Sequence, residues 1–251
     1  MFSTLGNKIV ERINRARYLR FAKSALRPEE YGDREKLKSE GYFSQNGQDK
    51  WVAEVILPGR RGGVFVDIGA HNGLLISNTY FLEKRLGWNG LAVEPNPSVY
   101  GKLQKNRSCA TVNACVGARD CTTVFRLIKG YAEQLSGILD HYQPVHLSRI
   151  NSEINQYGGS YQDVEVTCYS INTLLEKHKL YNIDYLSIDV EGGELSIISE
   201  INFEIFNVSV IGIENNYADF MIPQLLKKRG FDFHSIVGDE FYVNRKRFQV
   251  V

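Results

Sequence analysis

The stretch that decides the fold is Val64-Phe-Val-Asp-Ile-Gly-Ala-His-Asn-Gly73. A short apolar run leads to the carboxylate of Asp67, and Gly69 follows two residues later. This pattern predicts a buried parallel strand that turns tightly onto a helix, which is where open α/β sheets bind nucleotides. Because the spacing Gly69-x-x-x-Gly73 is not the G-x-G-x-x-G that approaches a pyrophosphate, it favours a nucleoside ligand without a diphosphate.

Length and composition are those of an ordinary soluble globular protein. The chain has 251 residues, which suits one α/β domain with an appendage, or at most two small domains. Its formal net charge is +1, so the bulk composition gives no argument for a nucleic-acid partner, and we expect none. No apolar run approaches the roughly 20 residues that a membrane-spanning helix needs.

Cysteine usage favours a reducing compartment. The four cysteines are Cys109, Cys115, Cys121 and Cys168, and no two of them form a C-x-x-C pair, which argues against a zinc site. They lie in or beside strand-like runs, where reduced thiols pack as small apolar side chains. We therefore expect core thiols and a cytoplasmic protein.

The first residues predict a basic amphipathic helical arm over residues 1–40. Residues 1–28 hold seven Lys or Arg against one acid, Glu11. Apolar residues recur there at helical spacing: Phe2, Leu5, Ile9, Ile13 and Ala16. Arg27-Pro-Glu-Glu30 is expected to break the helix. Three roles remain open: packing on the main domain or on a second copy in a homo-oligomer, peripheral contact with an anionic membrane, or an organelle presequence.

Residues 41–251 predict one α/β domain. Strand-like runs cover 64–68, 90–94, 110–116, 184–189 and 208–214. Helix-like segments cover 74–87, 97–106, 171–180, 194–201 and 218–229. Such alternation predicts a mostly parallel sheet with helices on both faces. The last two runs, Phe231–Val237 and Glu240–Asn244, are joined so closely that they must form an antiparallel hairpin. A Rossmann-like sheet of seven strands closed in this way is the layout of class I methyltransferases.

An insertion of about residues 121–170 separates the third and fourth parallel strands. Val124–Ile128 and Val164–Tyr169 read as added strands, and the stretch between them is polar and aromatic. Long loops inside compact domains are commonly lids or binding loops. We assign the insertion to substrate recognition as a loop, and a mobile surface excursion is the alternative.

Acidic and apolar residues follow the second and third strands. Glu94 ends the run Leu91-Ala-Val-Glu-Pro95, where a carboxylate accepts hydrogen bonds from both ribose hydroxyls of a nucleoside. Its alternative role is to cap the helix that begins after Pro97. Ala114 and Cys115 offer small, apolar surface where an adenine ring would lie.

Three carboxylates follow the fourth strand in Tyr185-Leu-Ser-Ile-Asp-Val-Glu-Gly-Gly-Glu194. Like charges in a cleft repel, so such a group suits a cation, either a sulfonium ligand or a metal. Glu194 has the alternative of favouring the next helix N-terminus, and Glu191 of being solvated. Asp189 is the strongest candidate for catalysis, with Glu191 as a second.

A metal site is predicted where the fourth and fifth strands end side by side. Glu214 and Asn215 follow the fifth strand, and the tips of neighbouring strands lie about 5 Å apart. With Asp189 they offer oxygen ligands for Mg²⁺, Mn²⁺ or Ca²⁺. A metal there would lower the pKa of a substrate hydroxyl. A metal-free polar rim is the alternative.

Two histidines are weaker candidates. His71 lies in the first glycine loop, where it would touch the amino-acid end of a ligand. His234 lies on the final hairpin and is a candidate general base. For either residue a structural role is the alternative.

With these residues assembled, the chain resembles the FkbM-type family of S-adenosylmethionine-dependent methyltransferases over about residues 42–244. Four motifs carry the resemblance: Ser44-Gln-Asn-Gly-Gln-Asp49, Phe65-Val-Asp-Ile-Gly-Ala-His-Asn-Gly73, Val93-Glu-Pro95 and Ser187-Ile-Asp-Val-Glu-Gly-Gly-Glu194. The resemblance implies S-adenosylmethionine as cofactor and O-methylation of hydroxyls on sugars, glycans or natural products. The metal trio is also similar to that of catechol-type O-methyltransferases, although Glu214 replaces an aspartate.

The resemblance and the residue patterns together give a full set of expected site residues. Those expected to bind the cofactor are Gln48, Asp67, Gly69, Ala70, His71, Asn72, Gly73, Glu94, Pro95, Ala114, Cys115 and Asp189. Asp189, Glu191 and His234 are the expected catalytic residues, in a direct in-line transfer that holds sulfur and oxygen about 3 Å apart. A nicotinamide oxidoreductase is disfavoured by the missing G-x-G-x-x-G. A non-catalytic adenosyl-binding scaffold with a membrane- or partner-binding arm is the alternative function.

Overall fold

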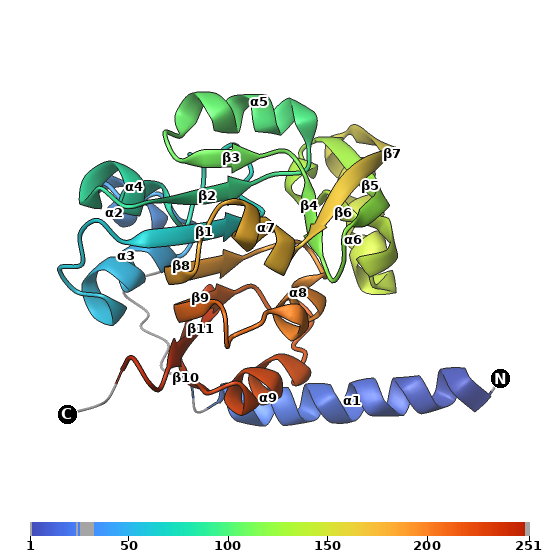
Figure 1. Cartoon of the computed structure of the whole chain (residues 1–251). Helices are drawn as coiled ribbons and strands as arrows, with labels where there is room; N and C mark the ends of the chain where they lie inside the picture. Colours follow the sequence, from blue (N-terminus) through green and yellow to red (C-terminus); the bar gives the residue numbers. More distant parts are fainter. Residues whose placement is uncertain (1, 24, 26–32, 249–251) are drawn as a thin grey trace.

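A seven-stranded β-sheet forms the centre of the molecule (Figure 1). The computed structural model describes residues 2–23, 25 and 33–248, with side chains from Arg12 onward. The strand order in the sheet is β3-β2-β1-β8-β9-β11-β10. These strands are β1 (Val64–Ile68), β2 (Asn89–Val93), β3 (Ala110–Val112), β8 (Asn182–Ile188), β9 (Asn207–Ile213), β10 (Phe231–Val237) and β11 (Asp239–Asn244).

The pairing of these strands confirms the predicted class I layout. β1 pairs in parallel with β2 and with β8, and β8 pairs in parallel with β9. β11 runs antiparallel to both β9 and β10, so the predicted hairpin closes the sheet. The chain reverses between β10 and β11 at Gly238, whose φ of 69° is one that glycine adopts readily.

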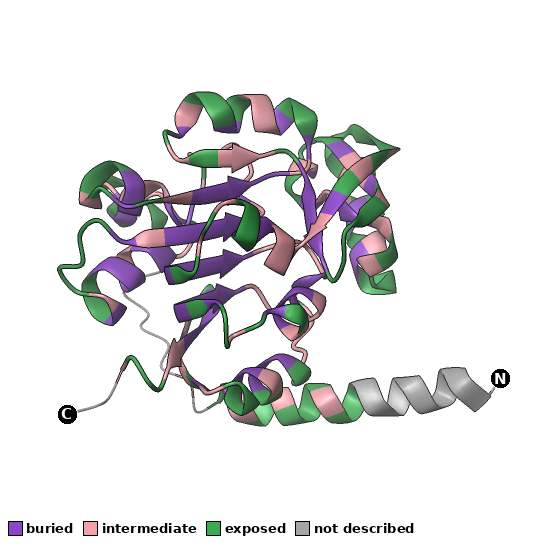
Figure 2. Ribbon diagram, in the orientation of Figure 1, coloured by how far each residue is buried: buried purple, intermediate pink, exposed green. Residues whose placement is uncertain are grey.

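Helices cover both faces of the sheet, because alternate side chains of each strand point to opposite faces. One face is covered by α7 (Ile171–Lys177), α8 (Glu194–Glu200) and α9 (Met221–Lys228). The other is covered by α3 (Gln48–Trp51), the π-helical turn η2 (Val52–Ile56) and α4 (Tyr80–Leu86). Val66 and Leu186 pack on the first group, whereas Phe65 and Tyr185 pack on the second. The central strands are accordingly buried (Figure 2).

The helix predicted over residues 74–87 is shorter than expected. α4 begins only at Tyr80. Before it, Ile76 adopts a φ of 53° and pairs with Ser44 in an isolated bridge. A left-handed residue cannot continue a right-handed helix, so the chain reaches the helix through an irregular loop.

The strand predicted over residues 110–116 is in fact two strands. β3 ends at Val112, and β4 (Cys115–Gly117) belongs to a different sheet. Asn113 holds the turn between them, because its side-chain amide donates to the backbone carbonyls of Glu94 and Pro95 at 2.8 and 2.9 Å. This change of sheet carries the chain from the main domain into the insertion.

The insertion is a folded unit rather than the predicted loop. Its four-stranded sheet has the order β4-β7-β5-β6, with β5 at Cys121–Gly130, β6 at Gly137–Ile138 and β7 at Gly159–Ser170. The two strands predicted within it are therefore confirmed and longer than expected. Helix α6 (Pro144–Tyr157) packs on this sheet around a core that includes Ile128 and Ile150. The unit lies beyond the carboxyl ends of the main parallel strands (Figure 1).

The N-terminal arm contains helix α1 (Phe2–Ala22), whose last part lies beside α9 (Figure 1). Phe21 contacts the rings of Phe220 and Phe233, with centroid distances of 6.3 and 4.4 Å. Ile13 and Leu19, in contrast, are exposed. The predicted break at residues 27–30 and the apolar side chains at positions 2, 5 and 9 lie outside the described residues. Within the described part of the chain, no helix is long and apolar enough to cross a membrane.

All four cysteines are free thiols, but they are not all in the core. Cys115 and Cys168 are buried and Cys109 is half-buried, as expected. Cys121 is exposed, so the expectation of a core thiol is wrong at this position. Cys121 is the first residue of β5, and this strand begins at the surface.

Candidate active site

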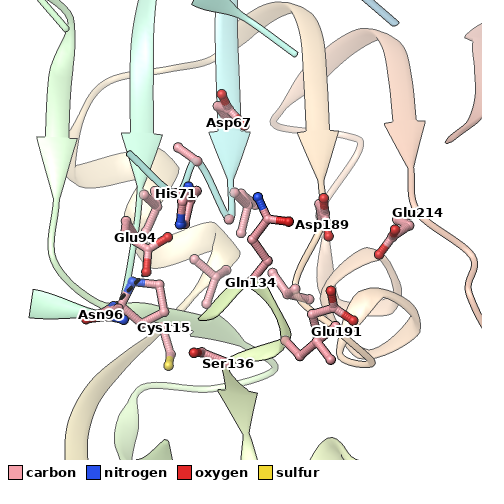
Figure 3. Close-up of a pocket in the computed structure, with 18 of the residues that line it drawn as sticks. Asp67, His71, Glu94, Asn96, Cys115, Gln134, Ser136, Asp189, Glu191 and Glu214 are labelled. Atoms are coloured by element: carbon pink, nitrogen blue, oxygen red, sulfur yellow. Dashed lines mark hydrogen bonds between the residues drawn. The ribbon is translucent and has the colours of Figure 1, made fainter. Parts of the chain in front are cut away.

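A cavity of about 330 Å³ lies at the carboxyl edge of the main sheet, between the sheet and the insertion (Figure 3). The strand register explains why polar residues meet there. Ile68 is paired with both Val93 and Ile188, and Ile188 is paired with Ile213. The residues that follow these four therefore reach one edge together. They are Gly69, Glu94, Asp189 and Glu214, and all of them line the cavity.

Gly69 is required by the close approach of two strand ends. Its φ is 87°, and a Cβ atom placed on it would lie 1.7 Å from the carbonyl oxygen of Asp189. The backbone N–H groups of Gly69 and Ala70 both donate to the carbonyl of Val93, at 3.0 and 2.9 Å. The glycine turn, which follows β1, is thus hydrogen-bonded to the end of β2 and lies against the end of β8 at this edge of the cavity.

Glu94 lies on the cavity wall beside His71 and Asn96 (Figure 3). One of its oxygens accepts the backbone N–H of Asn96 at 2.7 Å, and the backbone N–H of His71 also donates to the carboxylate. Burial raises the pKa of Glu94 to about 7, although these hydrogen bonds oppose the shift. Two fixed N–H groups therefore hold a carboxylate that retains acceptor capacity toward the cavity.

Asp67 lines the same cavity, but its carboxylate is engaged in a buried network. It accepts a hydrogen bond from Thr79 Oγ1 and lies 3.7 Å from Arg107 Nη1. Arg107 is fully buried and also pairs with Glu83. Figure 3 shows Asp67 set apart from Glu94 and Asp189. The structure therefore gives this carboxylate a scaffolding role, tying β1 to the loop before α4 and to the end of α5 (Pro97–Asn106).

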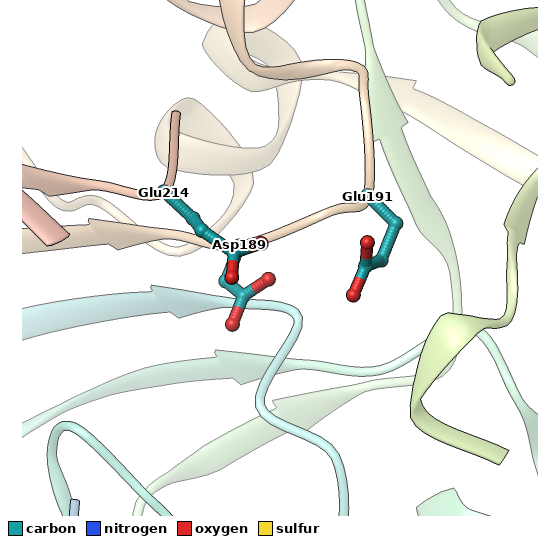
Figure 4. A group of neighbouring side chains, drawn as sticks. All are labelled: Asp189, Glu191 and Glu214. Carbon is teal, nitrogen blue, oxygen red and sulfur yellow. The ribbon is translucent and has the colours of Figure 1, made fainter. Parts of the chain in front are cut away.

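Three carboxylates meet at the other end of the cavity: Asp189, Glu191 and Glu214 (Figure 4). Each offers an oxygen within 4.8 Å of the others. Burial, and next the charge of Asp189, raise the pKa of Glu191 and of Glu214. Burial also raises the pKa of Asp189, while a hydrogen bond with Glu214 opposes that shift. Glu214 is therefore the protonated group of this pair, and it donates its proton in a hydrogen bond to the Asp189 carboxylate.

The backbone at Glu191 is strained. Its φ is 60°, which is costly for a residue with a long side chain. The two following glycines pack against His141 of the insertion, where a Cβ atom on Gly193 would lie 2.7 Å from His141 Nδ1. As a result the Glu191 carboxylate lies in the cavity, and its buried Oε2 atom has no hydrogen-bond partner among the described residues.

The insertion supplies lining residues that the sequence did not single out: Glu133, Gln134, Leu135, Ser136 and Arg149. Gln134 and Ser136 lie opposite the strand ends in Figure 3. Nε2 of His71 lies 3.2 Å from Glu133 Oε1, which joins the glycine loop to the insertion. The only sequence signal for these residues was the polar character of the stretch.

The wall beside Glu94 is apolar. It is built from Pro95, Ala114, Cys115, Val116, Phe125 and Ile138. Ala114 and Cys115 are almost completely buried, and Phe125 and Ile138 come from the second sheet. An apolar surface next to a carboxylate suits a flat heterocycle joined to a ribose.

Five predicted site residues do not line this cavity: Gln48, Asn72, Gly73, Asn215 and His234. Gln48 donates to Asp239 at 3.3 Å, and the Asn72 side chain caps the turn at residues 74–75. Gly73 packs against side chains of Leu103 and Arg107. The Asn215 amide donates to Glu240 at 2.9 Å and its oxygen accepts the Asp219 N–H at 2.8 Å, so both polar groups of this side chain are engaged by other residues.

His234 is also remote from the cavity. Its strand, β10, is the outermost strand of the sheet, separated from β8 by two others. The centroid of its ring lies 5.9 Å from that of Trp51, and Nδ1 lies 3.0 Å from Ser235 Oγ. His234 does not reach the cavity, because the edge position of its strand directs it toward the packing around α3. The general-base assignment therefore lacks geometric support.

Strand order, glycine turn and acidic strand ends together define a class I methyltransferase fold. A family model described as the Methyltransferase FkbM domain matches residues 67–233, more than half of the chain. The chain belongs to the FkbM methyltransferase family. Family and fold support S-adenosylmethionine-dependent methyl transfer. No curated protein matches the chain.

Solved methyltransferase structures match at low identity. The FkbM methyltransferase from Methylobacillus flagellatus KT is 12% identical with a TM-score of 0.46, over 78% of this chain and 47% of that one. A TehB-like SAM-dependent methyltransferase from Corynebacterium glutamicum ATCC 13032 Kitasato is 14% identical with a TM-score of 0.38, over 86% and 94%. The N-terminal domain of human METTL16 in complex with SAH is 11% identical with a TM-score of 0.35, over 78% and 65%. The chain thus spans about half the length of the FkbM structure that it matches.

Proposed function

We propose that the protein is an S-adenosylmethionine-dependent O-methyltransferase that acts on a hydroxyl of a sugar, glycan or natural product. One observation carries the proposal: a single cavity has an apolar wall and the Glu94 carboxylate at one end and three carboxylates at the other. The first end suits adenosine, and the second suits a sulfonium and the hydroxyl that receives its methyl group.

The residues that hold the cofactor act at separate points of this cavity. Ala114 and Cys115 bind the adenine ring, and Glu94 accepts hydrogen bonds from the ribose hydroxyls. The carboxylate of Asp189 faces the sulfonium, which supplies an activated methyl group when the cofactor is bound. A buried carboxylate without a nearby cation is costly, so positive charge at this position is favourable. His71 remains the candidate for the amino-acid end.

Asp189 and Glu191 prepare the acceptor hydroxyl. Asp189 orients the hydroxyl for in-line attack, since alignment of the reacting atoms supplies much of the acceleration. As the oxygen takes the methyl group and the sulfur–carbon bond breaks, the hydroxyl proton passes to a carboxylate of the trio. Glu191 suits this role, because its raised pKa and unpartnered Oε2 atom make it a ready proton acceptor when ionised.

The donor set also fits a hard divalent cation. Three carboxylate oxygens that lie close together are the ligands that Mg²⁺, Mn²⁺ or Ca²⁺ prefer. Asp189, Glu191 and Glu214 would hold such an ion, in place of the predicted trio with Asn215. When bound, the ion would make a coordinated hydroxyl more acidic. The effect of chelation on activity tests this part of the proposal.

The direct test uses the purified full chain. Calorimetry with S-adenosylhomocysteine measures the donor site, and transfer of a labelled methyl group to hydroxyl compounds, followed by mass spectrometry, measures the reaction. Absence of saturable binding would contradict the proposal at its base. Tight binding without turnover on any acceptor, together with full biological function after Asp189→Ala, would instead favour the non-catalytic scaffold with a partner-binding arm.

A further inference from the structure

A second cavity of about 230 Å³ adjoins the first. The two share six lining residues, namely Gln45, Ile76, Asn78, Asp189, Glu214 and Asn216. Asp189 and Glu214 therefore line both the first cavity and the second. A molecule in the second cavity would therefore meet the same two carboxylates as a molecule in the first.

The remote end of the second cavity is lined by polar groups from distant parts of the chain. Asn46 and Gln48 come from the turn into α3, and Asp239 and Glu240 come from the start of β11. Tyr18 of α1 completes the lining, and it hydrogen-bonds to Glu240. Closely spaced amides and carboxylates form a surface with many donors and acceptors, which suits a ligand rich in hydroxyl groups.

The charged side chains that line the second cavity are all acidic among the described residues. Four carboxylates line the second cavity, and no Lys, Arg or His does so among the residues that the structure describes. The two remote carboxylates accept hydrogen bonds from neutral partners: Asp239 from Gln48 and Asn78, and Glu240 from Tyr18, Asn215 and Tyr242. Each carboxylate oxygen has two lone pairs, so both groups retain acceptor capacity. Buried carboxylates without a cationic partner favour a ligand that brings one.

We propose that the second cavity is the acceptor site, and that it takes a hydroxylated compound bearing an amine, such as an amino sugar. The hydroxyl that is methylated points to Asp189, where the second cavity joins the first and Glu191 lies close by, while the ammonium group lies at Asp239 and Glu240. This inference rests on the proposed function and narrows its substrate class. Anionic acceptors such as uronic acids or sugar phosphates are excluded, because they would add a like charge to the carboxylates.

Helix α1 belongs to this acceptor site. Tyr18 lines the cavity from outside the sheet, and α1 is held against α9 and β10 by the packing of Phe21. The arm thereby contributes a wall to the acceptor cavity without touching the donor cavity. Changes at Tyr18 should alter acceptor binding and leave donor binding unchanged.

The test uses three matched probes: a neutral methyl hexoside, the corresponding 2-amino sugar and the corresponding uronate. Their binding to the full chain saturated with S-adenosylhomocysteine is measured by ligand-observed NMR. We expect the amino sugar to bind at least tenfold more tightly than the neutral sugar, and the uronate not to bind. Equal binding of all three, or preference for the uronate, would overturn the inference.

Two variants and one control test which residues bind the amino sugar. Asp239→Asn removes the charge but keeps the shape, and should weaken binding of the amino sugar about tenfold, as expected for loss of a charge-assisted hydrogen bond. Tyr18→Ala changes only the arm, so it is the second test of the cavity if Asp239→Asn does not fold. It should weaken the binding of all accepted sugars. Asp232→Asn is the control, because Asp232 is exposed on β10 and pairs with Arg245. An unchanged amino-sugar preference in folded Asp239→Asn would contradict the assignment.

Failure of the inference and failure of the proposed function give different results. If the wild-type chain does not bind S-adenosylhomocysteine in calorimetry, the proposed function itself fails. If it binds this compound but shows no preference for the amino sugar, only the acceptor assignment fails. The donor affinity of Asp239→Asn and Tyr18→Ala should equal that of the wild type.

Discussion

His146 Nδ1 lies 3.6 Å from Glu191 Oε2, and this contact joins the insertion to the carboxylates of the main sheet. Nε2 of the same ring lies 3.4 Å from the carbonyl oxygen of Leu135. A carbonyl only accepts hydrogen bonds, so this contact assigns the ring proton to Nε2 and leaves Nδ1 unprotonated, facing Glu191 beyond hydrogen-bond distance. Burial lowers the pKa of His146, which keeps the ring neutral near pH 7. The neutral ring therefore borders the Glu191 carboxyl group without bringing a charge to it.

The first prediction concerns this histidine. His146→Phe retains the stacking on Tyr142, whose ring centroid lies 4.6 Å away, and removes both ring nitrogens. We expect kcat to fall at least roughly tenfold and the acid limb of its pH profile to move to higher pH, since an apolar ring beside Glu191 raises the pKa of that carboxyl group further. Affinity for S-adenosylhomocysteine should not change. His178→Phe, at a ring that lines neither cavity, is the matched control.

Asp189 should be essential for turnover. Asp189→Ala or Asp189→Asn is expected to lower methyl transfer by roughly a hundredfold or more, because the hydroxyl loses the carboxylate that orients it. Circular dichroism should show an intact fold. Asp163→Asn, an exposed residue paired with Arg126, controls for surface charge. Near wild-type turnover by the Asp189 variants would remove this residue from the mechanism.

Glu94 should act mainly on cofactor affinity. Glu94→Ala is expected to weaken binding of S-adenosylhomocysteine by about 1–3 kcal/mol, the cost of losing a charged hydrogen-bond acceptor. Calorimetry measures the difference directly. The exposed Glu204→Ala serves as the control. Wild-type affinity in Glu94→Ala would disprove the ribose assignment.

The ligand-free protein should lose stability as the pH rises. Burial is the largest cause that raises the pKa of Glu94, Glu194 and Asp239 to about 7, above the range of carboxyl groups in an unfolded chain. The folded state therefore binds more protons than the unfolded state between about pH 4.5 and pH 7, so the free energy of unfolding falls across this interval. Urea unfolding at several pH values measures the slope. Glu94→Gln should flatten it, and a slope of opposite sign would contradict these shifts.

Metal dependence has a simple outcome. If a divalent ion assists the reaction, dialysis against a chelator should abolish most activity, and adding back Mg²⁺ or Mn²⁺ should restore it. Glu214→Gln should then weaken restoration by the metal, since it removes one carboxylate of the trio. Activity that is unchanged after chelation would end the metal hypothesis.

The sequence predicted the parallel sheet because its signals are local. The strand-like runs at residues 64–68 and 184–189 and the turn glycine Gly69 are readable within a few residues. The short turn at Gly238 predicted the closing hairpin for the same reason. Register then places Asp189 and Glu214 together without further information.

Contacts between distant segments could not be read in this way. Asp67 and Arg107 are 40 residues apart, and only the folded chain shows that the arginine engages the carboxylate that was expected to bind a ligand. Asn215 follows Glu214 directly, yet its amide is engaged by Glu240 from another strand. The sequence could not show which residues of the insertion reach the site. Gln134 and His146 come close to it only because α6 and its sheet fold over the strand ends.

The contact between Gly69 and the carbonyl of Asp189 has a consequence for the evolution and engineering of this protein. Any β-carbon at position 69 would displace the backbone that carries the Asp189 carboxylate. Redesign aimed only at nucleoside selectivity would therefore disturb the chemical step as well, unless the end of β8 were rebuilt in the same variant.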